Sequence, residues 1–138
     1  MQSLSLELAD KLLAAASALA RDAYGKPVCV SVCDAYGFLI AFSRMDGAPV
    51  RSIQLAQQKA YTCTRMGVST VAFLARLRSE DVPIGFFCDP LLTALPGGAL
   101  LADAHGRLLG AVGVSGLAPA DDQALAEQLA TELLHLTG

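Results

Sequence analysis

The sequence contains no run of basic residues, and this limits the partners that the chain can bind. Its seven arginines are scattered, and only Arg76 and Arg78 lie close together. The formal net charge is -3 and the isoelectric point is near 5.2. Binding to a phosphate backbone requires clustered Lys and Arg side chains. We therefore expect no nucleic-acid partner.

The four cysteines, at positions 29, 33, 63 and 88, include no CxxC pair. Cys29 and Cys33 fall in a predicted strand, where residues four apart share a face but lie about 13 Å apart at roughly 3.3 Å per residue. A disulfide requires a Cα separation of about 4.4 to 6.8 Å. We expect free, buried thiols in a reducing compartment. Because no cluster of His, Cys, Asp and Glu has the spacing of a metal site, we expect no metal.

No apolar run reaches the ~18 residues that a membrane-spanning helix needs. The segment "LLAAASALA" near the N-terminus has the composition of a signal peptide's apolar region. However, no basic segment precedes it, and the acidic Glu7 and Asp10 do. These features predict a cytoplasmic protein with neither a signal peptide nor a membrane segment.

Apolar residues, in contrast, are abundant. The chain has 138 residues, which fits a single domain spanning residues 1–138. Hydrophobic residues make up 54% of the composition, and the mean hydropathy is +0.48. A small domain cannot bury so much apolar surface unaided. We therefore expect a homo-oligomer.

The pattern along the chain alternates helices with hairpins. Residues 5–23 have apolar positions at helical spacing, and "PVCVSVCDAYGFLIAFSR" is typical of a β-hairpin. Its turn places Asp34 and Gly37 where a tight turn needs them, and Asp103 and Gly106 repeat this order downstream. Two hairpins with similar turns indicate one antiparallel sheet.

Further helices are predicted from residues 52 to 66, from a cap at Ser69 through "STVAFLARLRSE", and in the C-terminal segment. A loop-rich region with a short strand follows residue 81. The order of these elements predicts an α+β, two-layer sandwich on an antiparallel sheet of about five strands.

The sequence resembles the GlcG and HbpS family, also found as the C-terminal domain of PduO-type proteins and often labelled haem-degrading or haem-binding. The resemblance rests on "VCDAYGFLIAFSRMDGAPVRSIQLAQQKAYTC", "PGG" at 96–98 and "GAVGVSG" at 110–116. It implies a profilin-like sandwich that assembles into dimers up to octamers. It also implies a link to haem, corrinoid or glycolate functions, or in one branch to a lyase acting on hydroxylaminobenzoate.

Arg44 and Asp46 follow the second predicted strand in "SRMDGA", at the mouth of any pocket between sheet and helix. The planar guanidinium of Arg44 can hold a carboxylate through two hydrogen bonds. The alternatives are a local Arg44–Asp46 pair, or an Asp46 side chain that braces the turn.

Lys59 lies on a predicted helix among apolar and hydroxyl side chains, and the family pattern matches at this position. It could bind an anion, or act as an acid or base if desolvation lowers its pKa. The alternatives are a lysine that covers apolar surface, or a salt bridge between subunits. The expected site is a pocket shared by Arg44 and Lys59 near a subunit interface, with Lys59 and Asp46 as the catalytic pair of an enzyme.

Other candidates for ligand binding surround these residues. Gly97 and Gly98 could present backbone N–H groups to an anion. Neither His105, in a hairpin turn, nor His135 is placed to ligate haem within one subunit, although an oligomer could bring His105 to a neighbouring pocket. The remaining candidates lie on the helix that carries Lys59: Tyr61, Thr62 and Arg65.

Three functions stay open from the sequence. The first, favoured by the resemblance, is a small-molecule binding protein for haem or another carboxylate-bearing ligand. The second is a cofactor-independent lyase or isomerase acting on a small aromatic or hydroxy acid. The third is a structural assembly module that binds no ligand.

Overall fold

A computed structural model of the chain describes residues 4–137. The elements in chain order are α1 (Leu6–Leu19), a short π-helical turn (Ala20–Tyr24), β1 (Cys29–Asp34), β2 (Leu39–Arg44), α2 (Arg51–Met66), α3 (Thr70–Glu80), a 3-10 turn (Ile84–Phe87), β3 (Gly98–Ala102), β4 (Leu108–Ser115) and α4 (Pro119–Thr137). No helix among these combines the length and apolar character needed to cross a bilayer.

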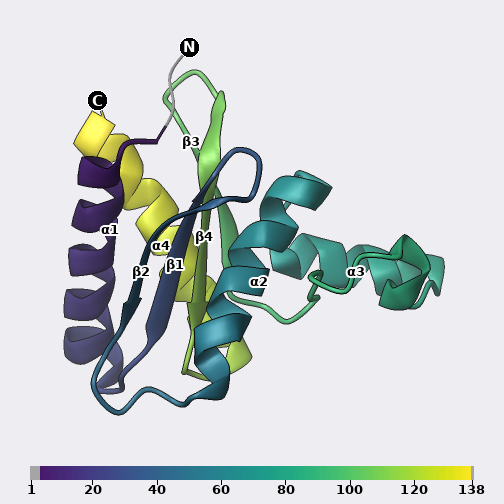
Figure 1. Cartoon of the computed structure of the whole chain (residues 1–138), viewed down its shortest axis with the longest axis horizontal. Coiled ribbons are helices and arrows are strands. Elements are labelled where there is room, and N and C mark those ends of the chain that lie inside the picture. Colours follow the sequence, from purple (N-terminus) through teal and green to yellow (C-terminus); the bar gives the residue numbers. More distant parts are fainter. Residues whose placement is uncertain (1–3, 138) are drawn as a thin grey trace.

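The strands form one antiparallel sheet in the order β2-β1-β4-β3. Helices α1 and α4 cover one face and α2 covers the other (Figure 1). The predicted α+β class with an antiparallel sheet is confirmed. The described residues contain four strands rather than about five, because the expected short strand between residues 81 and 98 is replaced by the 3-10 turn and a loop.

Both hairpin turns have the predicted chemistry. The Asp34 carboxylate accepts hydrogen bonds from the backbone N–H groups of Tyr36 and Phe38, at 2.9 and 3.0 Å. Asp103 accepts in the same way from two N–H groups of its own turn, at 2.9 Å each. Gly37 has φ +90°, a conformation that favours glycine.

The side chains of β1 point alternately to the two faces of the sheet, so the strand contributes to a separate core on each face. Val30 and Val32 pack with α1 and α4, whereas Cys29 and Cys33 face α2. The α2 face carries small residues, and at Gly113 of β4 the helix lies so close that an added Cβ would overlap the carbonyl oxygen of Ala56. The glycine at this position of "GAVGVSG" therefore allows the close approach of α2 to the sheet.

Helix α3 and the loop after it project away from the sandwich (Figure 1). This arm has its own small cluster, built on the buried Phe73, Leu77 and Leu92. The loop then returns along α2, so that Leu91 lies beside the helix surface. This return supplies one wall of the site described next.

Candidate functional site: a groove between α2 and the β1–β2 hairpin

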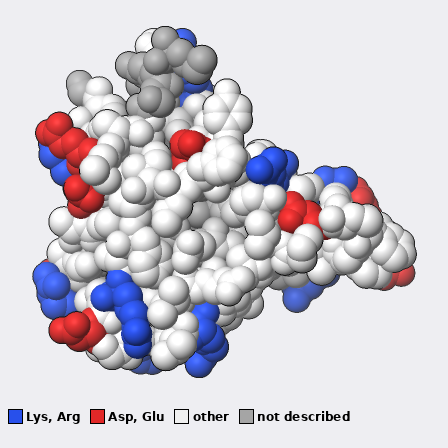
Figure 2. Space-filling model, in the orientation of Figure 1, with Lys and Arg blue, Asp and Glu red and all other residues white. Residues whose placement is uncertain are grey.

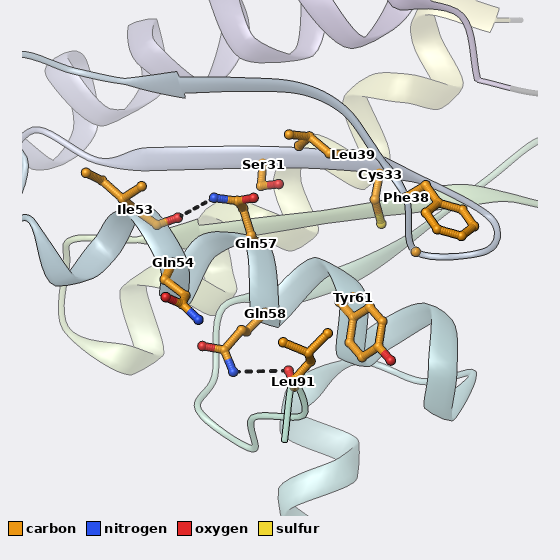
Figure 3. Close-up of a pocket in the computed structure, with 11 residues that line it drawn as sticks. Ser31, Cys33, Phe38, Leu39, Ile53, Gln54, Gln57, Gln58, Tyr61 and Leu91 are labelled. Carbon is orange, nitrogen blue, oxygen red and sulfur yellow. Dashed lines mark hydrogen bonds between the residues drawn. The ribbon is translucent and has the colours of Figure 1, made fainter. Parts of the chain in front are cut away.

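A cavity of about 440 Å³ opens between α2 and the first hairpin (Figure 3). It exists because α2 crosses β1, β4 and β3, while β2 lies beyond the helix at the edge of the sheet. The edge strand and the helix therefore form two sides of a groove. The lining residues are Ser31, Cys33, Gly37, Phe38, Leu39, Ile53, Gln54, Gln57, Gln58, Tyr61 and Leu91.

The walls of the groove are mostly apolar. Phe38 and Leu39 come from the hairpin and are 67% and 55% exposed, although both are large hydrophobic residues. Ile53 and Tyr61 face the cavity from α2, and Leu91 closes it from the loop. Exposed apolar side chains around a concavity are typical of a ligand-binding site.

The polar groups in the groove are uncharged. Gln57 donates to the Ile53 carbonyl oxygen at 3.1 Å, and Gln58 donates to the Leu91 carbonyl oxygen at 3.1 Å. Gln54 also lines the cavity. None of the described lining residues carries a formal charge, so the groove suits a ligand whose inserted part is neutral.

Tyr61 is held rigidly at one end of the groove. Its hydroxyl donates to Asp89 at 2.6 Å, and the guanidinium carbon of Arg65 lies 4.8 Å from the centre of its ring. The hydrogen bond to Asp89 raises the pKa of Tyr61 and lowers that of Asp89. The aromatic ring is therefore fixed by a carboxylate at its tip and a cation over its face.

Thr62 plays a structural part beside it. Its hydroxyl donates to the Gln58 carbonyl oxygen at 2.7 Å and accepts from the N–H of Thr93 at 2.9 Å. The side chain is fully buried. Thr62 thus ties the returning loop to α2, and it does not line the groove.

Lys59 points away from the groove into the core. Its Nζ donates to the Val114 carbonyl oxygen at 2.8 Å and to Asp122 at 3.2 Å, and none of the residue is exposed. Burial lowers the pKa of Lys59, and the carboxylate of Asp122 opposes that shift. The structure therefore does not support the predicted pocket shared by Arg44 and Lys59.

Arg44 and Asp46 lie at the other end of the hairpin, on the surface. Arg44 donates to the Ala48 carbonyl oxygen at 3.3 Å, and both side chains line a separate cavity near the end of α1. The groove lining includes neither residue. The structure consequently does not place Asp46 and Lys59 together as a catalytic pair.

Gly97 and Gly98 use their N–H groups inside the protein. Gly97 donates to Gln123 at 2.7 Å, and Gly98 donates to Thr70 at 2.9 Å. Gln123 returns a hydrogen bond to the Gly98 carbonyl oxygen at 2.9 Å. The predicted anion contact is replaced by this buried network, which joins β3 to α3 and α4.

Sequence reasoning missed most of the groove. Phe38 and Leu39 were expected as ordinary strand residues, and Gln54 and Gln57 carry no recognisable motif. Asp122, the partner of Lys59, lies in the first turn of α4. His105 and His135 are exposed and outside the groove lining, and residues 4–137 contain no group of three or more His, Cys, Asp or Glu that could hold a metal.

Comparison with known proteins identifies the family to which this chain belongs. Residues 4–131 match the family model described as haem degrading protein HbpS-like. The chain belongs to the HbpS-like family. Among curated relatives, it is 32% identical over 131 residues to an uncharacterised 15.0 kDa protein in the dhaT-dhaS intergenic region of Citrobacter freundii, covering 89% of this chain and 92% of that one. It is also 34% identical over 88 residues to protein GlcG of Escherichia coli K12, covering 64% and 63% of the two chains.

Several solved structures share the fold. The crystal structure of Klebsiella pneumoniae protein ORFY has a TM-score of 0.85 at 27% identity, covering 96% of this chain and 91% of that one. A crystal structure of a PduOC–haem complex gives 0.83 at 28% identity, covering 96% of each chain. Crystalline HbpS gives 0.85 at 29% identity, covering 96% and 92%.

Proposed function

We propose that this HbpS-like chain binds a flat, largely apolar small molecule in the groove between α2 and the β1–β2 hairpin, with haem as the leading candidate. The observation that carries the proposal is the apolar cavity of about 440 Å³. Small-molecule sites commonly have volumes of about 300 to 1,000 Å³ and a few polar groups that set orientation. The family match and the PduOC–haem complex support haem as the first ligand to test.

The groove suits the ring of such a ligand. Phe38 and Leu39 on the hairpin offer apolar contact, and the fixed ring of Tyr61 offers an aromatic surface. Arg65, beside Tyr61, is the cation that we assign to a ligand carboxylate. Asp89 at the same end partly offsets this charge, so we expect apolar contact to contribute most of the affinity.

The groove residues do not suit the haem iron. The lining holds no histidine or methionine, and its one thiol, Cys33, is buried, which raises the pKa of that thiol to about 12. The Tyr61 hydroxyl is engaged by Asp89. If haem binds, we propose that an iron ligand comes from outside this groove, and His105 of a second copy is the candidate to test.

A haemin titration tests the proposal. We expect a saturable Soret shift at micromolar haemin. Leu39→Ser should weaken binding about tenfold, because it removes apolar contact of the kind that contributes about 1.5 to 3 kcal/mol when fully buried. Leu6→Ser is the matched control, since Leu6 is similarly exposed at 59% but lies on α1 outside the groove.

The results test the location of the site and the identity of the ligand separately. Equal loss in the Leu39 and Leu6 variants would remove the groove from the proposal. Absence of saturable binding by haemin and by other planar aromatic acids would overturn the binding function itself. A changed Soret position in His105→Ala, with affinity for the ring retained, would assign the iron ligand to that histidine.

The predicted homo-oligomer stays a prediction. Its measurement is light scattering of the purified chain over a range of concentrations. The lyase or isomerase alternative receives no support from the arrangement of Lys59 and Asp46, and we do not propose it.

A further inference from the structure

A second cavity, of about 710 Å³, lies at the opposite end of the hairpin from Tyr61. Three segments meet there: the end of the first helical region, the link into β1, and the end of β2. The lining residues are Ser17, Arg21, Gly25, Lys26, Pro27, Arg44, Met45 and Asp46. Three of these are cations, in a chain whose formal net charge is -3.

The three cations have no carboxylate partner within ion-pair distance in the part of the chain that the structure describes. The ion pairs found there involve Lys11, Lys59, Arg76 and His135 instead. Figure 2 shows blue side chains gathered at the lower end of the molecule, where α1 ends and β2 turns toward α2, with an acidic group among them. Three cations and one carboxylate, Asp46, line this cavity, so an excess of positive charge remains there, and a bound anion would relieve the repulsion among the cations.

The backbone around this cavity is fixed. Gly25 ends the helical region with φ +63°, which turns the chain toward Lys26. Met45 donates its N–H to the Val28 carbonyl oxygen at 3.0 Å, and its sulfur accepts from the N–H of Val28 at 3.4 Å. Arg44 is bonded to the Ala48 carbonyl oxygen. The cationic side chains therefore project from backbone segments that are held in place by these contacts.

We propose that this cavity is a second binding site, for a small molecule that carries a multivalent oxyanion, either a polycarboxylate or a phosphate. Arg44 can supply a planar, two-pronged contact to such a group, and Arg21 and Lys26 add charge from the facing segments. Asp46 on the same lining can accept a hydrogen bond from a hydroxyl or ammonium group of the ligand. The site is independent of the groove, because the two cavities share no lining residue.

Calorimetric titration of the full chain with citrate and with pyrophosphate, at low ionic strength, tests the proposal. We expect at least one probe to bind, with Arg44→Gln, Lys26→Gln and Arg21→Gln each lowering the association constant about tenfold. Asp46→Asn should tighten binding of pyrophosphate, because it removes a repelling charge. Arg78→Gln is the control, since it removes an exposed positive charge from α3, away from the cavity.

Each result of the titrations either supports or overturns the proposed second site. Losses confined to the three cavity variants support it, and the preferred probe then identifies the oxyanion as carboxylate or phosphate. An equal loss in Arg78→Gln would overturn it, because attraction would then be a property of the whole surface. Failure of both probes to bind at millimolar concentration would also overturn it. Haemin binding should be unchanged in Arg44→Gln, which keeps this test separate from that of the groove.

Discussion

Lys59 and Asp122 form an ion pair inside the core, with the ammonium nitrogen 3.2 Å from a carboxylate oxygen. The same ammonium group donates to the Val114 carbonyl oxygen, and the other oxygen of Asp122 accepts from the N–H of Leu117 at 2.9 Å. Burial raises the pKa of Asp122, and the positive charge of Lys59 opposes that shift. One contact therefore joins the middle of α2 to the end of β4 and the start of α4.

Replacing only one member of this ion pair should destabilise the fold strongly. Lys59→Met or Asp122→Leu alone should each cost about 3 to 5 kcal/mol, because an unpaired buried charge or polar group remains. The double variant should lose much less free energy of unfolding than the sum of the losses in the two single variants. Urea unfolding of the four proteins gives the coupling energy.

The control for this cycle is the surface pair of Lys11 and Glu7, which lie 3.8 Å apart and are largely exposed. Lys11→Met should change the free energy of unfolding by at most about 0.5 kcal/mol. Additive losses in the Lys59 and Asp122 variants would show that the two groups are not coupled.

The hydrogen bond from Tyr61 to Asp89 should make stability depend on pH at both extremes. The pKa of Tyr61 is raised above 10.0, so the contribution is complete below that pH and is lost as pH rises through the higher value. The pKa of Asp89 is lowered below 3.8, so the contribution is complete above that pH and is lost as pH falls through the lower value. Melting temperatures of the wild type and Tyr61→Phe should differ by a constant amount between about pH 5 and pH 9 and converge outside this window. A difference that persists unchanged at both extremes would contradict this assignment.

Gly113 should not tolerate a methyl group. Gly113→Ala places a Cβ against the Ala56 carbonyl oxygen, and the backbone of α2 must move to admit it. Overpacking of this kind costs about 1 to 3 kcal/mol. Gly85→Ala is the control, because a Cβ there meets nothing within 4 Å. Chemical denaturation of the two variants should show a loss at Gly113 alone.

The thiols should divide into one reactive and three protected groups. Cys88 is exposed, which corrects the expectation that all four are buried, whereas Cys29, Cys33 and Cys63 are buried. Burial raises the pKa of Cys33 and of Cys63 to about 12 and also raises that of Cys29.

At pH 8, a thiol–disulfide exchange reagent should modify one thiol rapidly and the others only after unfolding, since the thiolate is the reacting form. Cys88→Ser should abolish the rapid phase. A rapid phase that survives in this variant would place a second thiol within reach of solvent.

Local chemistry made much of the fold predictable. The turns at Asp34 and Asp103 depend on side-chain bonds within four residues, and the cap at Ser69, which accepts from the N–H of Ala72 at 3.1 Å, depends on three. Helical spacing identified α2, which begins one residue earlier than expected. Apolar periodicity and cap chemistry act over a few residues, so they can be read from the chain itself.

The site could not be read in the same way. Lys59 was placed on the correct helix, but its partner Asp122 is 63 residues away, and only the packing of α2 against β4 and α4 brings the two together. Leu39 has the pattern of any half-buried strand residue. It lines a groove because β2 pairs on one side only and lies beyond the reach of α2.

The sequence by itself determined most of the secondary structure, the two hairpin turns and the family resemblance. The tertiary structure decided which polar side chains are enclosed and which apolar ones are left exposed. The physical reason is that burial depends on the order of strands in the sheet and on where each helix crosses it, and these are set by contacts between residues distant in the chain.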